Sequence, residues 1–281
     1  MYFRIVRHIV RLIDFFLYTS LFTACCATGL CMATERLITG VATPLANSLH
    51  LLVFGSTLLV YNMPRIIRKP HGRLRTMQYR KWHFFLFFTG SIFTVTALCL
   101  MSLQMVISSS VLGMVTFAYF LPILPFKNKK RLRDFGWLKI TVLAGVWTIA
   151  TSVLPILYWQ KNIDHYPFEI LIRLMFIFTL CVVFDIRDMQ TDQKNNINTL
   201  PQKVGIKNSY RLINVTLSLF VALSIIQYFR FHEMERLVSS LLTAIITRIV
   251  VSYLRIRPSD RAYLILADGV MLLYAVLVLI L

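Results

Sequence analysis

The sequence predicts an all-α, polytopic membrane protein with about nine transmembrane helices. Two features of its composition support this prediction. Apolar residues make up 57% of the 281 residues and charged residues only 15%, against roughly 25% charged in soluble domains. With a mean hydropathy of +0.68, a soluble fold would have nowhere to bury its apolar surface. These values exclude secreted disulfide scaffolds, disordered chains and ordinary cytosolic enzymes.

Apolar segments long enough to cross a bilayer recur along the whole chain. Such a helix needs roughly 20 mostly apolar residues. The segments that qualify lie at 12–32, 41–62, 83–104, 105–125, 138–158, 168–184, 209–229, 237–254 and 262–281. They leave nothing over for a soluble domain, so we expect a single transmembrane domain over 1–281. We expect Ser102, Gln104 and the serines at 108–110 to form the tight turn between the third and fourth helices.

The basic residues alternate from loop to loop as the positive-inside rule requires. With a cytoplasmic N-terminus, 24 of the 30 Lys and Arg residues fall in the inside segments or at the adjoining helix ends. Nine spans then place the C-terminus outside, in a cell or inner membrane. The net charge of +18 is therefore a signal of topology in a lipid bilayer, and we expect no nucleic-acid partner. A basic start before an apolar run is also typical of a signal peptide; we favour the span.

Most other polar residues within the apolar segments suggest structural roles. The cysteines have no metal-ligand spacing and are expected to pack as small apolar side chains; they are Cys25, Cys26, Cys31, Cys99 and Cys181. Arg173 is expected to extend outward to the interface, and His83 to lie at the interface. Arg248 and Asp268 either pair with each other or line a cavity, because charges inside a membrane are often functional.

Three aspartates stand out at the predicted cytoplasmic end of the sixth helix. If that helix continues, the spacing of Asp185, Asp188 and Asp192 places all three carboxylates within about 60° of one another around its axis. Like charges on one face repel, and hard oxygen ligands at a membrane surface suit Mg²⁺ together with substrate phosphate oxygens. Alternatively, the acids form a solvated helix end and pair with Arg187 and Lys194.

The stretch DIRDMQTDQKNNINTLPQKVG around these acids resembles the second aspartate-rich motif of the UbiA superfamily of intramembrane prenyltransferases. Asp188 and Asp192 match its D-x-x-x-D pair, and Asp185 is an additional acid one turn earlier. Tyr119, the basic run 127–133 and the closing ADGVMLLYAVLVL also resemble the family. The resemblance implies a UbiA-like helical bundle in which Mg²⁺ on two aspartate motifs holds a polyprenyl diphosphate. Such enzymes transfer the isoprenoid chain to an aromatic or other lipophilic acceptor.

The sequence departs from the family at the first aspartate motif, N-D-x-x-D-x-x-x-D. Asn62 is retained, but Met63, Ile66 and Pro70 stand at the aspartate positions. Cations lie among them, so we hypothesise that this loop contacts the diphosphate without a metal. The residues expected to bind diphosphate are Asn62, Arg65, Arg68, Lys69, Lys129, Lys130 and Lys194. Alternatively, the cations of this loop only set the topology beside lipid headgroups.

Two classes of function therefore remain. One is a Mg²⁺-dependent prenyltransferase whose metal ligands are Asp185, Asp188 and Asp192. The other is a catalytically degenerate UbiA-like protein that binds isoprenoid or lipid, or that scaffolds partners. Retention of the second motif favours the enzyme, and loss of the first favours the alternative.

Overall fold

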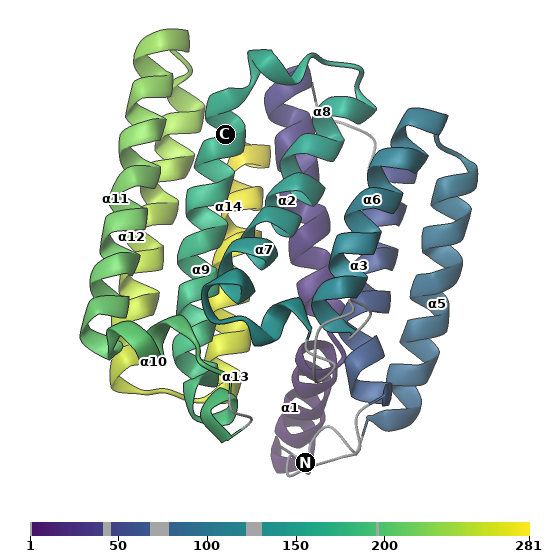
Figure 1. Cartoon of the computed structure of the whole chain (residues 1–281), viewed down its shortest axis with the longest axis vertical. Coiled ribbons are helices and arrows are strands. Elements are labelled where there is room, and N and C mark those ends of the chain that lie inside the picture. Colours follow the sequence, from purple (N-terminus) through teal and green to yellow (C-terminus); the bar gives the residue numbers. More distant parts are fainter. Residues whose placement is uncertain (1, 42–45, 68–78, 122–130, 195–196) are drawn as a thin grey trace.

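Long helices arranged side by side form the whole of the described structure. The computed structural model describes residues 2–41, 46–67, 79–121, 131–194 and 197–281. Its principal helices are α1 (Tyr2–Tyr18), α2 (Leu21–Thr39), α3 (Ser48–Ile67), α5 (Arg80–Cys99), α6 (Leu103–Phe120), α7 (Gly136–Thr148), α8 (Leu154–Tyr158), α9 (Pro167–Lys194), α10 (Leu200–Val204), α11 (Ile206–Phe231), α12 (Met234–Ile256), α13 (Asp260–Ala262) and α14 (Asp268–Ile280). Figure 1 shows α2, α9 and α14 in the middle, with α11 and α12 on one side and α3, α5 and α6 on the other.

The helices confirm an integral, multi-pass membrane architecture. Within the described ranges, eight helical segments are long and apolar enough to cross a membrane. Two of them contain a π-helical turn, Ile149–Val153 between α7 and α8 and Tyr263–Ala267 between α13 and α14. The helix α3 lies among these spans without being one of the eight, and its 20 residues include the polar side chains of His50, Asn62 and Arg65. The predicted count of nine is therefore approximate.

The first predicted span was misplaced. The sequence predicted one helix over 12–32, but the chain breaks at Ser20, which has a left-handed φ of 63°. Residues before the break form the separate helix α1, in which apolar side chains such as Ile9 and Leu12 are exposed. Residues after the break form α2, the first of the apolar spans. Neither glycine nor proline marks this break, so local sequence signals did not reveal it.

The tight connection between the third and fourth predicted spans is confirmed in part. Leu100–Ser102 join α5 to α6, and Ser102 is the N-cap residue of α6. Gln104 and the serines at 108–110 lie inside α6, so their predicted place in the turn was wrong. Both helices expose large apolar side chains such as Phe88, Ile92 and Met114, which is the surface that a helix presents to lipid.

Two glycines allow α3 and α5 to touch backbone to backbone. A Cβ added at Gly90 would lie 2.6 Å from the carbonyl oxygen of Gly55, and one added at Gly55 would lie 2.9 Å from the carbonyl oxygen of Gly90. Small residues at such crossings are typical of packed membrane helices, because close approach increases van der Waals contact. This crossing fixes α3, whose far end carries Arg65 toward the functional cavity described below.

We predict that Gly90→Ala lowers the stability of the protein by about 1–3 kcal/mol, because the added methyl group separates α3 from α5. Gly113→Ala in α6 is the matched control, since a Cβ there meets nothing within 4 Å. Thermal unfolding in detergent measures both variants. Equal unfolding temperatures for the two variants would contradict the close crossing.

Candidate functional site

A charged cavity of about 230 Å³ lies at one end of the bundle, where α3 and α9 end and α7 and α14 begin. Four cationic side chains and three carboxylates line it. They are Arg65, Arg133, Lys139, Arg187, Asp185, Asp188 and Asp268. Two of the three predicted metal ligands, Asp185 and Asp188, therefore line the same cavity as Arg65, one of the predicted diphosphate ligands. The N-terminal helix α1 and the short helices α10 and α13 lie toward the same end of the bundle (Figure 1).

A lysine joins two of the three predicted metal ligands. The helix α9 continues to Lys194, as the spacing argument required. Lys139 Nζ, from α7, donates to Asp185 Oδ1 at 2.6 Å and to Asp192 Oδ2 at 2.5 Å. All three side chains are buried. One ammonium group therefore relieves the repulsion between two carboxylates two turns apart. It lies beside the acids for which the sequence predicted Mg²⁺.

The third predicted ligand has a different partner. Both carboxylate oxygens of Asp188 accept hydrogen bonds from Arg187, at 2.9 and 3.1 Å. The Arg187 guanidinium also lies over the Phe184 ring, 4.8 Å from its centroid. The alternative pairing of the acids with Arg187 is thus present for Asp188, although this residue lines the cavity and is not part of a solvated helix end.

Two buried polar atoms of the cavity wall have no hydrogen-bond partner among the described residues. They are Asp185 Oδ2, an acceptor, and Arg133 Nε, a donor. Arg133 lies in a short 3₁₀ turn, Leu132–Asp134, that an ion pair between Arg131 and Asp134 closes at 2.8 Å. Burial raises the pKa of Asp134, but the hydrogen bonds from Arg131 outweigh it and keep that pKa below its ordinary value. The closed turn holds Arg133 at the cavity.

Asn62 does not line the charged cavity. Its Nδ2 donates to the carbonyl oxygens of Thr19 and Leu58, at 3.1 and 2.8 Å, and its Oδ1 lies 2.7 Å from His83 Nδ1. His83 is buried in the first turn of α5, and its place at the membrane interface stays a prediction. Because these contacts occupy both ends of the amide, Asn62 fastens α3 to the α1–α2 junction and to α5 and does not face the cavity.

The remaining predicted diphosphate ligands are not brought to this wall. Lys194 is exposed at the end of α9 and is not among the residues that line the cavity. Arg68, Lys69, Lys129 and Lys130 lie outside the described residues. Arg65 is present at the cavity, and its Nη1 also donates to the Tyr18 carbonyl oxygen.

The three charged residues inside the apolar segments have different surroundings and different partners. Asp268 lines the cavity and accepts a hydrogen bond from Thr23 at 3.0 Å. Arg248 is exposed and bonds to Ser252 of its own helix, so the alternative in which Arg248 pairs with Asp268 was wrong. Arg173 does not extend outward as predicted. It is fully buried, 3.4 Å from Glu169, with its guanidinium 5.0 Å from the centre of the Tyr274 ring.

An apolar cavity of about 360 Å³ adjoins the charged one. Its walls come from α3, α5, α6 and the segment from α7 to α8. Tyr61 lines both cavities, and its hydroxyl accepts a hydrogen bond from Trp147 Nε1 at 3.1 Å. The arrangement suits a ligand with a charged head and a long apolar tail, because each part meets its own kind of surface.

The donor set of the charged cavity fits one Mg²⁺ ion. Asp185 Oδ2 is a buried oxygen without a partner, and Asp188 lines the same wall. Mg²⁺ is commonly held by one or two carboxylates, with waters and substrate phosphate supplying the other ligands. Asp192 does not belong to this set, since it contacts Lys139 and does not line the cavity. That the three acids bind Mg²⁺ together stays a prediction.

Two cavity residues were not singled out from the sequence. In the sequence, Lys139 is one of the basic residues near a helix end and Arg133 closes a basic run. A lone lysine just inside an apolar segment was the available signal, because burial of its charge requires a partner. The partners themselves, 46 and 53 residues further on, could not be identified from local spacing.

Comparison with known proteins identifies the fold. No protein-family model matches the chain, and no curated protein matches it by sequence. Several solved structures match it in fold. A UbiA homologue from Archaeoglobus fulgidus bound to GPP and Mg²⁺ is 12% identical, with a TM-score of 0.67 over 95% of this chain and 100% of that one. An apo UbiA homologue from Aeropyrum pernix K1 is 13% identical, with a TM-score of 0.59 over 92% and 96%.

A further match is a structure concerned with digeranylgeranylglyceryl phosphate synthase, 16% identical, with a TM-score of 0.54 over 95% of this chain and 99% of that one. These likenesses show the fold of the chain, a membrane-embedded helical bundle. The bundle has the UbiA fold, and the fold that the sequence resemblance implied is thereby confirmed.

We predict that Lys139→Met destabilises the protein by about 3–5 kcal/mol, because it leaves Asp185 and Asp192 buried without their countercharge. Adding Asp185→Asn and Asp192→Asn to Lys139→Met should recover part of the loss. Lys207→Met, at an exposed lysine, is the matched control. Thermal unfolding measures each variant, and a Lys139→Met protein as stable as the Lys207→Met protein would contradict the bridge.

Proposed function

We propose that this protein binds a polyprenyl diphosphate and transfers its isoprenoid chain to a lipophilic acceptor within the membrane. The proposal rests on one observation: Tyr61 lines both the charged cavity and the apolar cavity, so the two cavities adjoin at this residue. The likeness to a UbiA homologue bound to GPP and Mg²⁺ supports this pairing of head and tail.

The cations of the charged cavity suit a diphosphate head. Two opposite unit charges 4 Å apart attract by about 4 kcal/mol at an effective dielectric constant of 20. Arg133 offers an unused buried N–H group, and Arg65 stands beside the position of the missing first aspartate motif. In this proposal, direct contacts from these two arginines replace the metal that the lost aspartates held in the family pattern.

The apolar cavity suits the prenyl tail and the reaction that follows. When the allylic C–O bond breaks, its electron pair leaves with the pyrophosphate and a carbocation remains. Cations around the leaving group stabilise the growing negative charge. The apolar walls exclude water that would capture the carbocation, and the ring faces of Tyr61 and Trp147 offer it negative π density. The acceptor then forms a new bond to the same carbon with its own electron pair and loses a proton, which the departing pyrophosphate accepts.

Asp185 and Asp188 would hold the proposed Mg²⁺. A bound Mg²⁺ ion would add positive charge to the pyrophosphate leaving group. Lys139 keeps Asp185 in place through Asp185 Oδ1, leaving Asp185 Oδ2 directed to this role. We also propose that the charged cavity faces the cytoplasm, because the basic loops are concentrated at the ends of the helices that form it.

We predict that Arg133→Gln weakens binding of labelled geranylgeranyl diphosphate by about 10- to 100-fold, the loss expected for one hydrogen bond to a charged group. Arg65→Gln should act similarly. Lys194→Gln removes the same charge from an exposed site off the cavity and should leave binding unchanged. Binding is measured on protein in lipid nanodiscs. If Lys194→Gln reduced binding as much as Arg133→Gln, the charged cavity would not be the diphosphate site.

We predict that Asp188→Asn lowers pyrophosphate release by about 10- to 100-fold in Mg²⁺, as loss of metal-site residues typically does. EDTA should abolish release but leave measurable binding, because the cations remain. Asp164→Asn, at an exposed acid outside the spans, is the control. Equal release from the two variants would contradict the enzymatic proposal.

The non-catalytic alternative is favoured by one observation. Lys139 pairs with both Asp185 and Asp192 and offsets one of their two negative charges, while the first aspartate motif is missing, so less carboxylate charge is available for metal than in the family pattern. A protein that binds prenyl diphosphate or another anionic lipid without turnover has this property. Binding that depends on Arg133, with no pyrophosphate release under any condition, would identify this class.

A further inference from the structure

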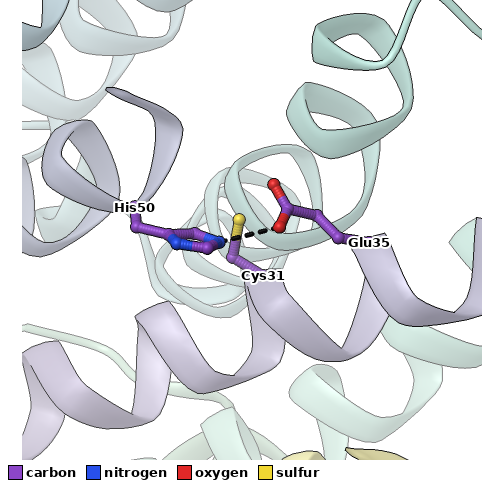
Figure 2. Close-up of side chains that lie close together, drawn as sticks. All are labelled: Cys31, Glu35 and His50. Carbon is purple, nitrogen blue, oxygen red and sulfur yellow. Dashed lines mark hydrogen bonds and ion pairs between the residues drawn. The ribbon is translucent and has the colours of Figure 1, made fainter. Parts of the chain in front are cut away.

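A second cluster of metal-ligating side chains lies in the half of the bundle away from the charged cavity. Cys31 and Glu35 are one turn apart on α2, and His50 is in the first turn of α3. A ligand atom from each lies within 4.8 Å of the other two. Figure 2 shows the thiol of Cys31 beside the line that joins His50 to Glu35. Among the described residues, these three are the group of metal-ligating side chains whose ligand atoms lie this close together.

We propose that Cys31, Glu35 and His50 bind a Zn²⁺ ion that fastens α2 to α3. Thiolate, imidazole and carboxylate are the ligands that Zn²⁺ takes in proteins. The spacing of Cys31 and Glu35 places both on one face of α2, which is the face that meets His50. This site is separate from the charged cavity and does not depend on the proposed function.

Burial and charge both favour an ion at this position. Cys31 and Glu35 are fully buried, and His50 is 4% exposed. A buried carboxylate must be paired in an apolar interior, and Glu35 already contacts His50 and Asn47, so an ion would join an existing polar group. The charges of Zn²⁺, one thiolate and one carboxylate sum to zero, and neutral imidazole adds none. Coordination requires loss of the thiol proton, which is released to solvent.

A simple ion pair between His50 and Glu35 accounts for only part of the cluster. His50 Nε2 lies 2.8 Å from Glu35 Oε2, and this contact leaves out the Cys31 thiol. The Cys31 thiol lies beside this pair. An ion replaces the hydrogen between nitrogen and carboxylate and draws in the sulfur, closing a triangle whose sides are about 3.5 Å in tetrahedral zinc sites.

Asn47 holds the ligands in position from outside the triangle. Its Nδ2 donates to both carboxylate oxygens of Glu35, at 3.1 and 3.4 Å, and its Oδ1 accepts the backbone N–H of His50 at 2.8 Å. One side chain thus orients ligands from both helices. Hydrogen-bonded partners of this kind are a regular part of metal sites, because they fix the direction of the ligand.

Metal content and ligation test the proposal on the full chain, purified in nanodiscs without a histidine tag. After chelation and addition of Zn²⁺, we expect one tightly held zinc ion per chain. Co²⁺ in its place should give tetrahedral visible bands and a near-ultraviolet thiolate-to-cobalt band. Zinc should also raise the unfolding temperature. No bound metal, or bound Co²⁺ without the thiolate band, would overturn the proposal.

Variants separate this site from other metal binding. Cys31→Ser and His50→Gln should weaken zinc binding by more than about tenfold, and Asn47→Ala by about 10- to 100-fold. Cys26→Ser removes another buried cysteine of α2, and Asp188→Asn alters the charged cavity; both should keep the zinc. If Cys31→Ser fails to fold, the thiolate band of the unaltered protein still decides. Equal zinc affinity in Cys31→Ser and Cys26→Ser would overturn the proposal.

Discussion

The contact of Lys139 with Asp185 and Asp192 is the constraint on which the charged end of the bundle depends. It joins the start of α7 to the last three turns of α9. Without a cation between them, two buried carboxylates on one helix face would repel each other and would be expensive to desolvate. The same contact sets the direction of the Asp185 carboxylate, and so decides which oxygen remains for a ligand.

The charge at this end of the bundle is balanced differently from the family pattern. Where that pattern has two groups of aspartates, this chain keeps one group and adds cations around it. Four cationic and three acidic side chains then line one small cavity, and Asp192 lies behind Lys139. The apolar cavity beyond Tyr61 is larger, about 360 Å³ against about 230 Å³, so the two kinds of surface meet at one side chain.

Much of the fold could be predicted from the sequence, because the length of an apolar segment and the charge of a loop are local properties. The continuation of α9 through Asp192 also followed from spacing alone. The site followed only in part. The bridge to Lys139 needs two helices brought together, and the use of Asn62 in packing depends on Thr19 and His83, which are distant in sequence. The grouping of Cys31 with Glu35 and His50 could not be predicted for the same reason: Glu35 is near in sequence, but the position of His50 depends on how α2 meets α3.

The break at Ser20 couples the path of the chain to the shape of the cavity. Ser20 and Thr23 line the charged cavity, and the carbonyl groups of Tyr18 and Thr19 accept hydrogen bonds from Arg65 and Asn62. The few residues where α1 leaves the axis of α2 are thus also part of the cavity wall. A shift in the angle between α1 and α2 would therefore displace the end of α3 and reshape the cavity at the same time.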